Sequence, residues 1–352
     1  MWSSLERRLA AFVFGATLLP LSACGGRATE DVGSVVGVAD ELVIAAYSAP
    51  REAFERALIP AFEAEWKRTT GRSAKVRASY LGSGAQSRAV IQGFEADVAV
   101  LALESDVDKI ARAGLIPNDW RTRTGANGTV ARSLVVLAVR SGNPRGLHDW
   151  DDLGAADLEV LTPNPRTSGG AMWNLIAMYG SAALGPGGSA EAGVDRVRRV
   201  FRNVSVMDKG ARESLVNFER GIGDVAITYE QEVHVARKAG RNYDYVIPPR
   251  TVAIDIPAAV IDGYARPRGH QALAEAFVAF LRRADAQPLW ADWGFRPVGE
   301  AFAQPSHAAF PRLKADQTFA VAALGGWKSV MPSLFATRGS LTMAIEDVQA
   351  TR

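Results

Sequence analysis

The sequence has one cysteine, few histidines and no excess of charge of either sign. Cys24 is the single cysteine among 352 residues, so no disulfide can form within the chain. The 4 histidines are widely spaced and form no H-x-x-x-H or H-x-H pair, which argues against a zinc site. The formal charge of +2 comes from 40 basic and 38 acidic residues and predicts no basic surface for nucleic acid.

The chain also lacks the short motifs of common enzymes. It contains no G-x-S-x-G elbow, no G-x-x-x-x-G-K-[ST] phosphate loop and no G-x-G-x-x-G fingerprint. The acidic run Asp149-Trp150-Asp151-Asp152 is typical of turns and helix caps rather than of paired catalytic carboxylates. The sequence therefore predicts a protein that is not an enzyme, with no catalytic residue, no metal and no cofactor.

The amino terminus differs from the rest of the chain. Two arginines precede an apolar run over Leu9–Leu21, which is typical of a signal peptide and too short for a membrane span. The run ends in Leu-Ser-Ala-Cys, which resembles the lipobox of bacterial lipoproteins. We expect residues 1–23 to be removed, Cys24 to carry the lipid, and residues 24–40 to form a tether. The alternatives are a chance thiol in an ordinary signal peptide and an uncleaved anchor.

From Glu41 onward, short β-rich runs alternate with helical patterns, which predicts an α/β protein, and the length suggests two domains. The predicted strands are Leu42–Ala46, Lys75–Tyr80, Asp97–Leu101, Leu134–Val139, Leu158–Leu161, Val204–Met207 and Asp224–Thr228. The predicted helices are Ser105–Ala113, Met172–Tyr179, Val194–Val200, Ser214–Arg220 and Ala272–Arg282, besides a helical face of Phe54, Leu58, Phe62 and Trp66.

Small or hydroxylated residues are concentrated at four of the predicted strand-to-helix junctions. These are Tyr47–Pro50, Gly82–Gln86, Thr167–Ala171 and Lys209–Arg212. A helix N-terminus has backbone N–H groups without intrahelical partners and a positive dipole end, so such junctions can hold an anion. The alternative for the second junction is a capping box, in which Ser83 and Gln86 only satisfy first-turn amides. Tyr229 ends a predicted buried strand, where open α/β sheets usually hold ligands.

Read in order, several longer segments make the chain resemble the sulfate-binding proteins of bacterial ABC transporters. The similarity runs from about Glu41 to Arg352 and is carried by Gly93–Val98, Val139–Pro144, His148–Leu153, Thr162–Pro165, Ser168–Ala171, Gly210–Arg212, Glu219–Val225, Phe295–Pro297 and Gly325–Trp327. The resemblance implies a two-lobed periplasmic-binding-protein fold of type II, with the ligand cleft between lobes joined by crossing strands. The first lobe is expected over residues 41–132 plus 251–334 and the second over 133–250, with residues 335–352 as a tail packed on the first lobe.

The resemblance also implies a sulfate site made of uncharged donors. The expected ligand-binding residues are Ser48, Ser83, Gly84, Gly169, Gly170, Ala211 and Tyr229. Ser83 would contribute its hydroxyl and backbone, and the glycines and Ala211 their backbone N–H groups. The implied function is high-affinity sulfate binding outside the cytoplasmic membrane, at its extracellular face or in the periplasm, by a monomer that delivers sulfate to the permease subunits of an ABC transporter.

Two positions depart from the family pattern. Ser48 stands where the family usually has aspartate, and Tyr229 where it usually has a tryptophan whose indole N–H binds the anion. A phenol can accept as well as donate a hydrogen bond, which indole cannot. Two serines and a tyrosine also resemble the hydroxyl set of molybdate-binding relatives, so the alternative is a receptor for another tetrahedral oxyanion, namely molybdate, tungstate or thiosulfate.

Overall fold

The computed structural model describes residues 40–123, 125–302 and 307–351. The predicted signal peptide, Cys24 and the tether as far as residue 39 lie outside the described residues. Residues Val38–Arg352 form one compact unit. Within the described ranges, none of the helices is both long and apolar enough to span a bilayer.

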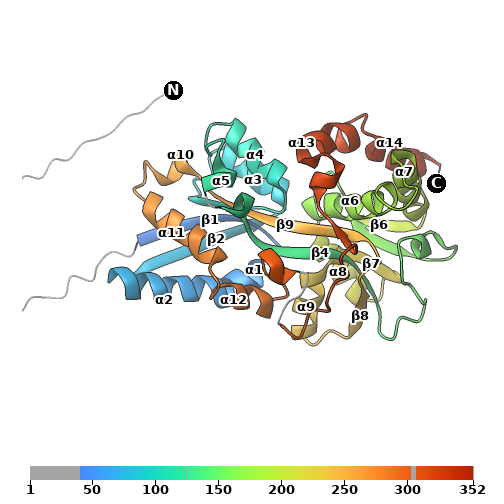
Figure 1. Ribbon diagram of the computed structural model, residues 1–352, viewed down its shortest axis with the longest axis horizontal. Helices are drawn as coiled ribbons and strands as arrows, with labels where there is room; N and C mark the ends of the chain where they lie inside the picture. The colour runs from blue at the N-terminus through green and yellow to red at the C-terminus, as the bar shows by residue number, and fades with distance from the viewer. Residues whose placement is uncertain (1–39, 124, 303–306, 352) are drawn as a thin grey trace, which may run out of the picture. The chain divides into compact units, whose positions relative to one another are not determined.

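Strands and helices alternate along most of the chain, as predicted (Figure 1). The strands are β1 Asp40–Tyr47, β2 Ala74–Leu81, β3 Val98–Val100, β4 Thr129–Arg140, β5 Val160–Pro163, β6 Val204–Asp208, β7 Val225–Tyr229, β8 Tyr243–Val246, β9 Thr251–Val260 and β10 Thr318–Phe319. The helices are α1 Arg51–Ala53, α2 Ile59–Thr70, α3 Ser83–Ile91, α4 Glu104–Arg112, α5 Trp120–Arg123, α6 Gly169–Ala183, α7 Ala190–Phe201, α8 Ala211–Glu219, α9 Glu230–Lys238, α10 Asp262–Ala265, α11 Gln271–Arg282, α12 Gln287–Asp292, α13 Gly326–Val330 and α14 Ser340–Ala350. A π-helical turn, Phe54–Leu58, joins α1 to α2.

The strands join in the order β2-β1-β3-β9-β4-β7-β5-β6, and this order divides the structure into two lobes. Parallel β1, β2 and β3 form the sheet of the first lobe together with the end of β9. Strands β5, β6, β7 and β8 form the sheet of the second lobe together with the end of β4. The predicted α/β class and the two-lobed arrangement are confirmed.

Two long antiparallel strands, β4 and β9, cross from one lobe to the other. Residues Thr129–Leu134 of β4 pair with Ala253–Pro257 of β9, and the two strands then separate. Beyond this ladder β4 continues alongside β7, and β9 continues alongside β3. Residues Leu134–Ala138 are fully buried, as expected for a strand covered on both faces. Each lobe is therefore built onto one end of a shared two-stranded ladder.

A buried ion pair holds the start of α9 against the segment that follows α12. The Arg296 guanidinium donates to both carboxylate oxygens of Glu230, at 2.6 and 2.8 Å, and both side chains are 0% exposed. Arg296 also donates to the carbonyls of Phe302 and Pro311. Burial raises the pKa of Glu230, and the hydrogen bonds from Arg296 act against that shift. Two-point pairing with further carbonyl partners is what a charge in a dry interior requires.

The predicted packing of the carboxyl-terminal tail on the first lobe is wrong. Helix α14 packs on α7 of the second lobe (Figure 1). Arg198 of α7 lies 3.7 Å from Asp347 of α14, and Arg166 of the second lobe pairs with Glu346. The sequence pattern of α14 shows an apolar face, but such a face does not specify which lobe it covers.

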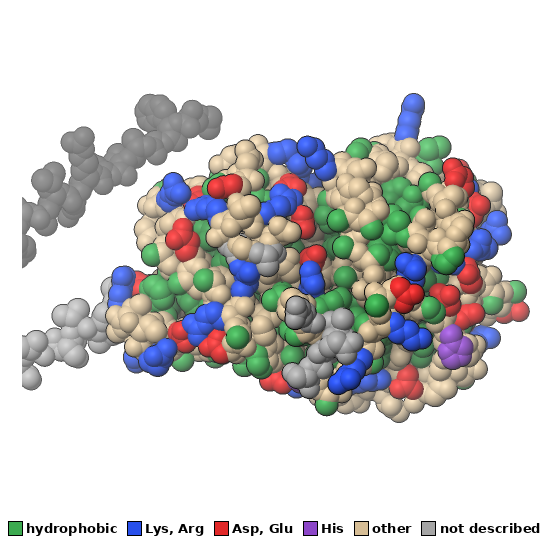
Figure 2. Space-filling view, in the orientation of Figure 1, with side chains coloured by type: hydrophobic (Ala, Val, Ile, Leu, Met, Phe, Trp, Pro, Cys, Tyr) green, Lys and Arg blue, Asp and Glu red, His purple; other side chains and the backbone are tan. Residues whose placement is uncertain are grey.

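Charged side chains of both signs are interspersed on the face shown in Figure 2. Opposite charges also pair locally: Arg121, for example, contacts Glu104 at 3.1 Å and Asp108 at 2.8 Å. The mixture agrees with the nearly neutral formal charge of the chain.

Candidate anion-binding site

Four helical segments begin at the carboxyl ends of strands, at the four junctions singled out in the sequence. They start at Arg51 after β1, Ser83 after β2, Gly169 after β5 and Ala211 after β6. Three of these starts have no side-chain cap, because their N-cap residues are Pro50, Gly82 and Gly210. Only α6 is capped, by the Ser168 hydroxyl, which accepts from Ala171 N at 3.4 Å. First-turn amides at these starts therefore have no intrahelical partner and can donate to a ligand.

The capping-box interpretation of Ser83 and Gln86 is wrong. Helix α3 begins at Ser83 with Gly82 as its N-cap, and no side chain caps it. The Ser83 hydroxyl instead donates to Asp106 Oδ2 at 2.6 Å and accepts from Ala102 N at 3.1 Å. A hydroxyl has one proton, and in this structure that proton points to Asp106. The group that Ser83 leaves for a ligand is its backbone N–H.

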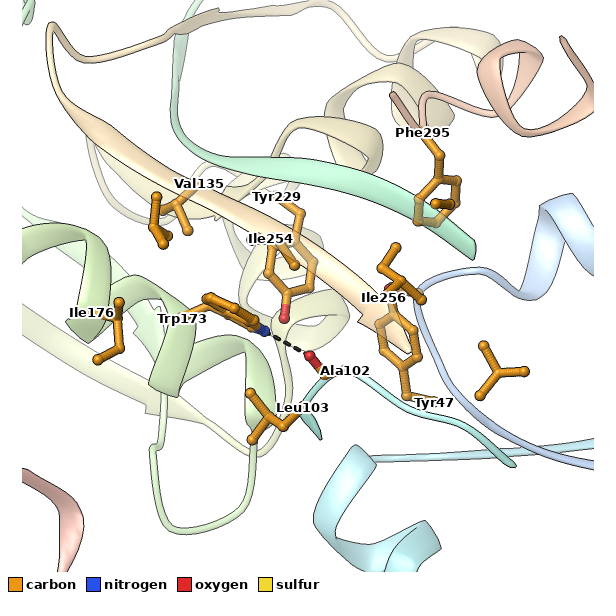
Figure 3. Close-up of a cluster of buried hydrophobic side chains, with 14 of the residues drawn as sticks. Tyr47, Ala102, Leu103, Val135, Trp173, Ile176, Tyr229, Ile254, Ile256 and Phe295 are labelled. Atoms are coloured by element: carbon orange, nitrogen blue, oxygen red, sulfur yellow. Dashed lines mark hydrogen bonds between the residues drawn. The ribbon is translucent and has the colours of Figure 1, made fainter. Parts of the chain in front are cut away.

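The two lobes meet where these helices begin. A Cβ added to Gly169 would lie 3.2 Å from Ser83 Cβ, and one added to Gly82 would lie 3.2 Å from the carbonyl oxygen of Thr167. The Trp173 indole N–H of the second lobe donates to the Ala102 carbonyl of the first, at 2.8 Å (Figure 3). The helix starts of the two lobes therefore face each other at contact distance.

Gly170 lies beside two other candidate residues of the second lobe, Ala211 and Tyr229, and beside Ser168. A Cβ added to Gly170 would lie 3.1 Å from Ala211 Cβ, 3.3 Å from Tyr229 Oη and 3.3 Å from Ser168 Oγ. A Cβ atom in a folded protein seldom lies as close as 3.0–3.4 Å to another heavy atom, so a side chain at position 170 would displace its neighbours. The structure thus brings together Ser83, Gly169, Gly170, Ala211 and Tyr229, and Gly84 follows Ser83 in the first turn of α3.

Tyr229 is buried at the end of β7, with 3% of its surface exposed. Its hydroxyl has no hydrogen-bond partner among the described residues. Burial, reinforced by the charge of Glu232, raises the pKa of Tyr229, so the phenol keeps its proton and can donate it. An unpaired hydroxyl in a dry site costs free energy unless a ligand or a water satisfies it. Figure 3 shows the Tyr229 oxygen directed toward the Trp173 and Ala102 side of the cluster.

Ser48 differs from the other candidates because its side chain is exposed. Its carbonyl accepts from Arg51 N at 3.3 Å, which forms the turn that opens α1. The neighbouring Tyr47 is 5% exposed, and burial raises its pKa, with a further contribution from Tyr229. Of these two residues, Tyr47 is the one that the structure places against Tyr229 (Figure 3).

Sequence reasoning missed three features of the site. Asp106 takes the Ser83 proton, Tyr47 lies beside Tyr229, and Arg212 joins the two lobes through Glu52. Asp106 is 23 residues from Ser83 and Arg212 is 160 residues from Glu52, so no local pattern connects these pairs. Arg212 does follow Ala211 in one of the junctions singled out in the sequence. That position was the signal from which a role of Arg212 near the site could have been predicted.

The site is rich in hydrogen-bond donors. Helix-start amides and a protonated phenol converge from both lobes, which is the arrangement that recognises a small anion. Both oxygens of Asp106 are engaged, because Oδ2 accepts from the Ser83 hydroxyl and Oδ1 lies 2.7 Å from the Lys109 amine. Within residues 40–123, 125–302 and 307–351, no group of three His, Cys, Asp or Glu side chains could hold a metal ion. The fold and site define a two-lobed receptor for a small ligand.

Comparison with known proteins gives the family. The model of the bacterial extracellular solute-binding proteins matches residues 42–296, and the chain belongs to this family. A sulfate-binding protein of Synechococcus elongatus is 40% identical over 96% of this chain and 95% of that protein. A thiosulfate-binding protein of Escherichia coli is 33% identical over 86% of this chain and 90% of that protein. The solved sulfate-binding protein SubI from Mycobacterium tuberculosis is 38% identical, with a TM-score of 0.77 over 84% of this chain and 100% of that one.

We predict that Gly170→Ala weakens binding of tetrahedral oxyanions about tenfold, because overpacking a filled site costs about 1–3 kcal/mol. The methyl group would push Ala211 and Tyr229 away from the position where their donors meet those of Ser83. Calorimetric titration with sulfate, thiosulfate and molybdate measures the effect. Gly210→Ala is the matched control, since a Cβ there meets nothing within 4 Å. Equal affinities for wild type and Gly170→Ala would show that the anion lies elsewhere.

Proposed function

We propose that this protein binds inorganic sulfate outside the cytoplasmic membrane and delivers it to the permease of an ABC transporter. The observation that carries the proposal is the meeting of uncapped helix starts from both lobes around Gly169, Gly170 and Ala211. The names of the relatives, which include sulfate-binding proteins at 40% and 38% identity, support the choice of anion. Ser48, Ser83, Gly84 and Tyr229 complete the proposed ligand set.

Electrostatics supports a site of this kind. Moving a bare dianion from water into an apolar medium costs on the order of tens of kcal/mol, so its oxygens need prearranged donors. Backbone amides at helix starts supply these donors without the loss of side-chain entropy. Hydrogen phosphate also carries a proton that must find an acceptor, and the carboxylate of Asp106 is already paired with Ser83 and Lys109. An anion whose oxygens all act as acceptors therefore suits these backbone donors best.

We propose that the protein works as a binding subunit and not as an enzyme, as a monomer that closes on its ligand. In this proposal one lobe comprises residues 41–132 and 251–334, and the other lobe comprises residues 133–250. Closure brings donors of both lobes onto one anion and is what a permease would recognise. The crossing of β4 and β9 supports movement of this kind, because each lobe continues only one end of the shared ladder.

Sulfate should bind one to one and raise the thermal unfolding temperature, because only the folded, closed protein assembles the donors. The measurement is thermal unfolding of the protein lacking residues 1–23, with sulfate, thiosulfate, molybdate, tungstate and chloride at equal ionic strength. We expect a clear shift with sulfate and none with chloride. A shift with molybdate or thiosulfate and none with saturating sulfate would overturn the proposed ligand.

Tyr229 supports the second candidate, a receptor for thiosulfate, molybdate or tungstate. Its phenol is shorter than the indole usual at this position and leaves more room for a larger anion, and a thiosulfate-binding protein is among the relatives. If the Tyr229 hydroxyl donates to the anion, Tyr229→Phe should weaken binding by about 1–3 kcal/mol. Tyr229→Trp should keep sulfate affinity if the cleft admits the larger ring, and should lose more of any molybdate binding, because the indole leaves less room for a larger anion. Unchanged affinities for every anion in both variants would remove Tyr229 from the site.

We propose further that the mature protein is anchored by lipid on Cys24. The proposal rests on the Leu-Ser-Ala-Cys motif and is supported by a family described as extracellular. Cys24→Ser should abolish incorporation of labelled palmitate and move the protein out of the detergent phase, because serine cannot form the thioether. Gly25→Ala serves as the control. Equal labelling of the wild type and Cys24→Ser would refute the anchor while leaving the binding function intact.

A further inference from the structure

A hollow between helices α5 and α11 is lined by residues of the first lobe alone. Its volume is about 440 Å³, within the range of roughly 300–1,000 Å³ that is usual for small-molecule sites. Its apolar part is formed by three buried residues, Trp120 of α5 and Ala259 and Val260 at the end of β9. Val260 pairs with the first residue of β3, whereas the proposed anion site lies beyond the carboxyl ends of strands. The hollow and the anion site are therefore different places.

Helix α11 presents one row of side chains to this hollow. Glu275, Ala279 and Arg282 are spaced at i, i+4 and i+7, so they lie on one face of the helix. Phe277 and Leu281 belong to the buried residues of α11, which pack into the core. Ala279 is exposed, and its small side chain leaves the middle of the row open. The row therefore has an acid at one end, a base at the other and a gap between them.

The Arg282 guanidinium is held in place without a counterion. Its Nε is buried and has no hydrogen-bond partner, and no carboxylate of the described residues pairs with it. A Cβ added to Gly125 would lie 2.9 Å from Nη1, 3.3 Å from Nη2 and 3.5 Å from Cζ, so the guanidinium lies against the backbone there. Gly125 has a φ of +67°, which glycine adopts without strain. A buried donor of this kind costs free energy unless a ligand or a water satisfies it.

The other two charged side chains of the hollow are already paired. Arg123 donates to Asp262 Oδ2 at 2.7 Å and lies 3.6 Å from Glu275. Glu275 also accepts from Gln271 Nε2 at 2.6 Å. A ligand anion would therefore pair with Arg282, while Glu275 opposes any second negative charge in the same space. This balance favours a monoanion over a dianion such as sulfate.

We propose that this hollow is a second ligand site, for a small organic monocarboxylate with an apolar chain or ring. The carboxylate accepts from Arg282, whose planar guanidinium matches the two oxygens of a carboxylate. The apolar part of the ligand covers Trp120, Val260 and Ala279 and so removes apolar surface from water. The inference does not depend on sulfate binding, because no residue that lines the hollow belongs to the proposed sulfate site.

The test is calorimetric titration of the protein lacking residues 1–23 with benzoate and hexanoate, with and without sulfate. Benzyl alcohol and hexanol are the uncharged analogues. We expect one acid to bind per protein, with the same affinity in sulfate, and the alcohols to bind at least tenfold more weakly. Arg282→Gln should weaken acid binding about tenfold, because it removes a charge-assisted hydrogen bond. Ala279→Leu should weaken it at least as much, because leucine fills the middle of the hollow without changing the charge.

The matched control is Arg283→Gln, which removes the same charge one residue along. Arg283 pairs with Glu65 and Asp285 and does not line the hollow, so this variant should keep the wild-type affinity for both acids. Thermal unfolding of each variant verifies that it is folded.

Binding of neither acid to the wild type would overturn the inference, and so would acid affinities that Arg282→Gln and Ala279→Leu both leave unchanged. Competition between sulfate and the acids would place the acids in the cleft and would exclude a second site. Equal affinities for acids and alcohols would exclude the carboxylate as the recognised group. Binding of the acids by a protein that does not bind sulfate would overturn the proposed function and support this inference.

Discussion

A buried anion without a countercharge must be surrounded by donors that cannot move away, and the whole cleft follows from that requirement. Backbone amides meet it best at the first turn of a helix, where they have no other partner. Each lobe places helix starts at the carboxyl ends of its parallel strands, so the donors of one lobe face those of the other. Glycine at positions 169 and 170 allows the helix starts to come close together, because a side chain at either position would meet Ser83, Ala211 or Tyr229. The absence of side-chain caps on α1, α3 and α8 has the same explanation, because a cap would consume the amides that the ligand needs.

Charged groups surround the cleft but are satisfied among themselves. Asp106 pairs with Ser83 and Lys109, Glu230 with Arg296, and Glu232 with Arg212. Each pair lies close to a donor of the site, so the acidic charge beside that donor is balanced by a basic one. This internal neutralisation allows acidic residues to lie near a place suited to an anion, and it makes the order of the site depend on contacts between distant parts of the chain.

The sequence predicted what depends on local chemistry. Strand and helix positions followed from apolar patterning, and the four junctions followed from small residues at helix starts. Strand β9 was missed because Asp255 and Pro257 interrupt its apolar run. In the structure Asp255 is paired with Arg132 at 2.6 Å, and Pro257 stands opposite Thr129, where the β4–β9 ladder ends. The use of the Ser83 proton by Asp106 could not be predicted, because it depends on how α3 and α4 pack and not on either helix alone.

The carboxyl-terminal segment makes contacts with both lobes, and this restricts how they can move. After β10, which pairs with β9, α13 reaches α4 of the first lobe, Trp327 packs edge-on against Trp173 at 4.9 Å, and α14 ends on α7 of the second. The chain thus connects the lobes a third time, beyond the two strands of the ladder. Two bodies joined by a two-stranded ribbon alone could both rock and twist. A third connection displaced from that ribbon opposes the twist and leaves rocking as the soft motion, so that opposed helix starts return to the same alignment at each closure.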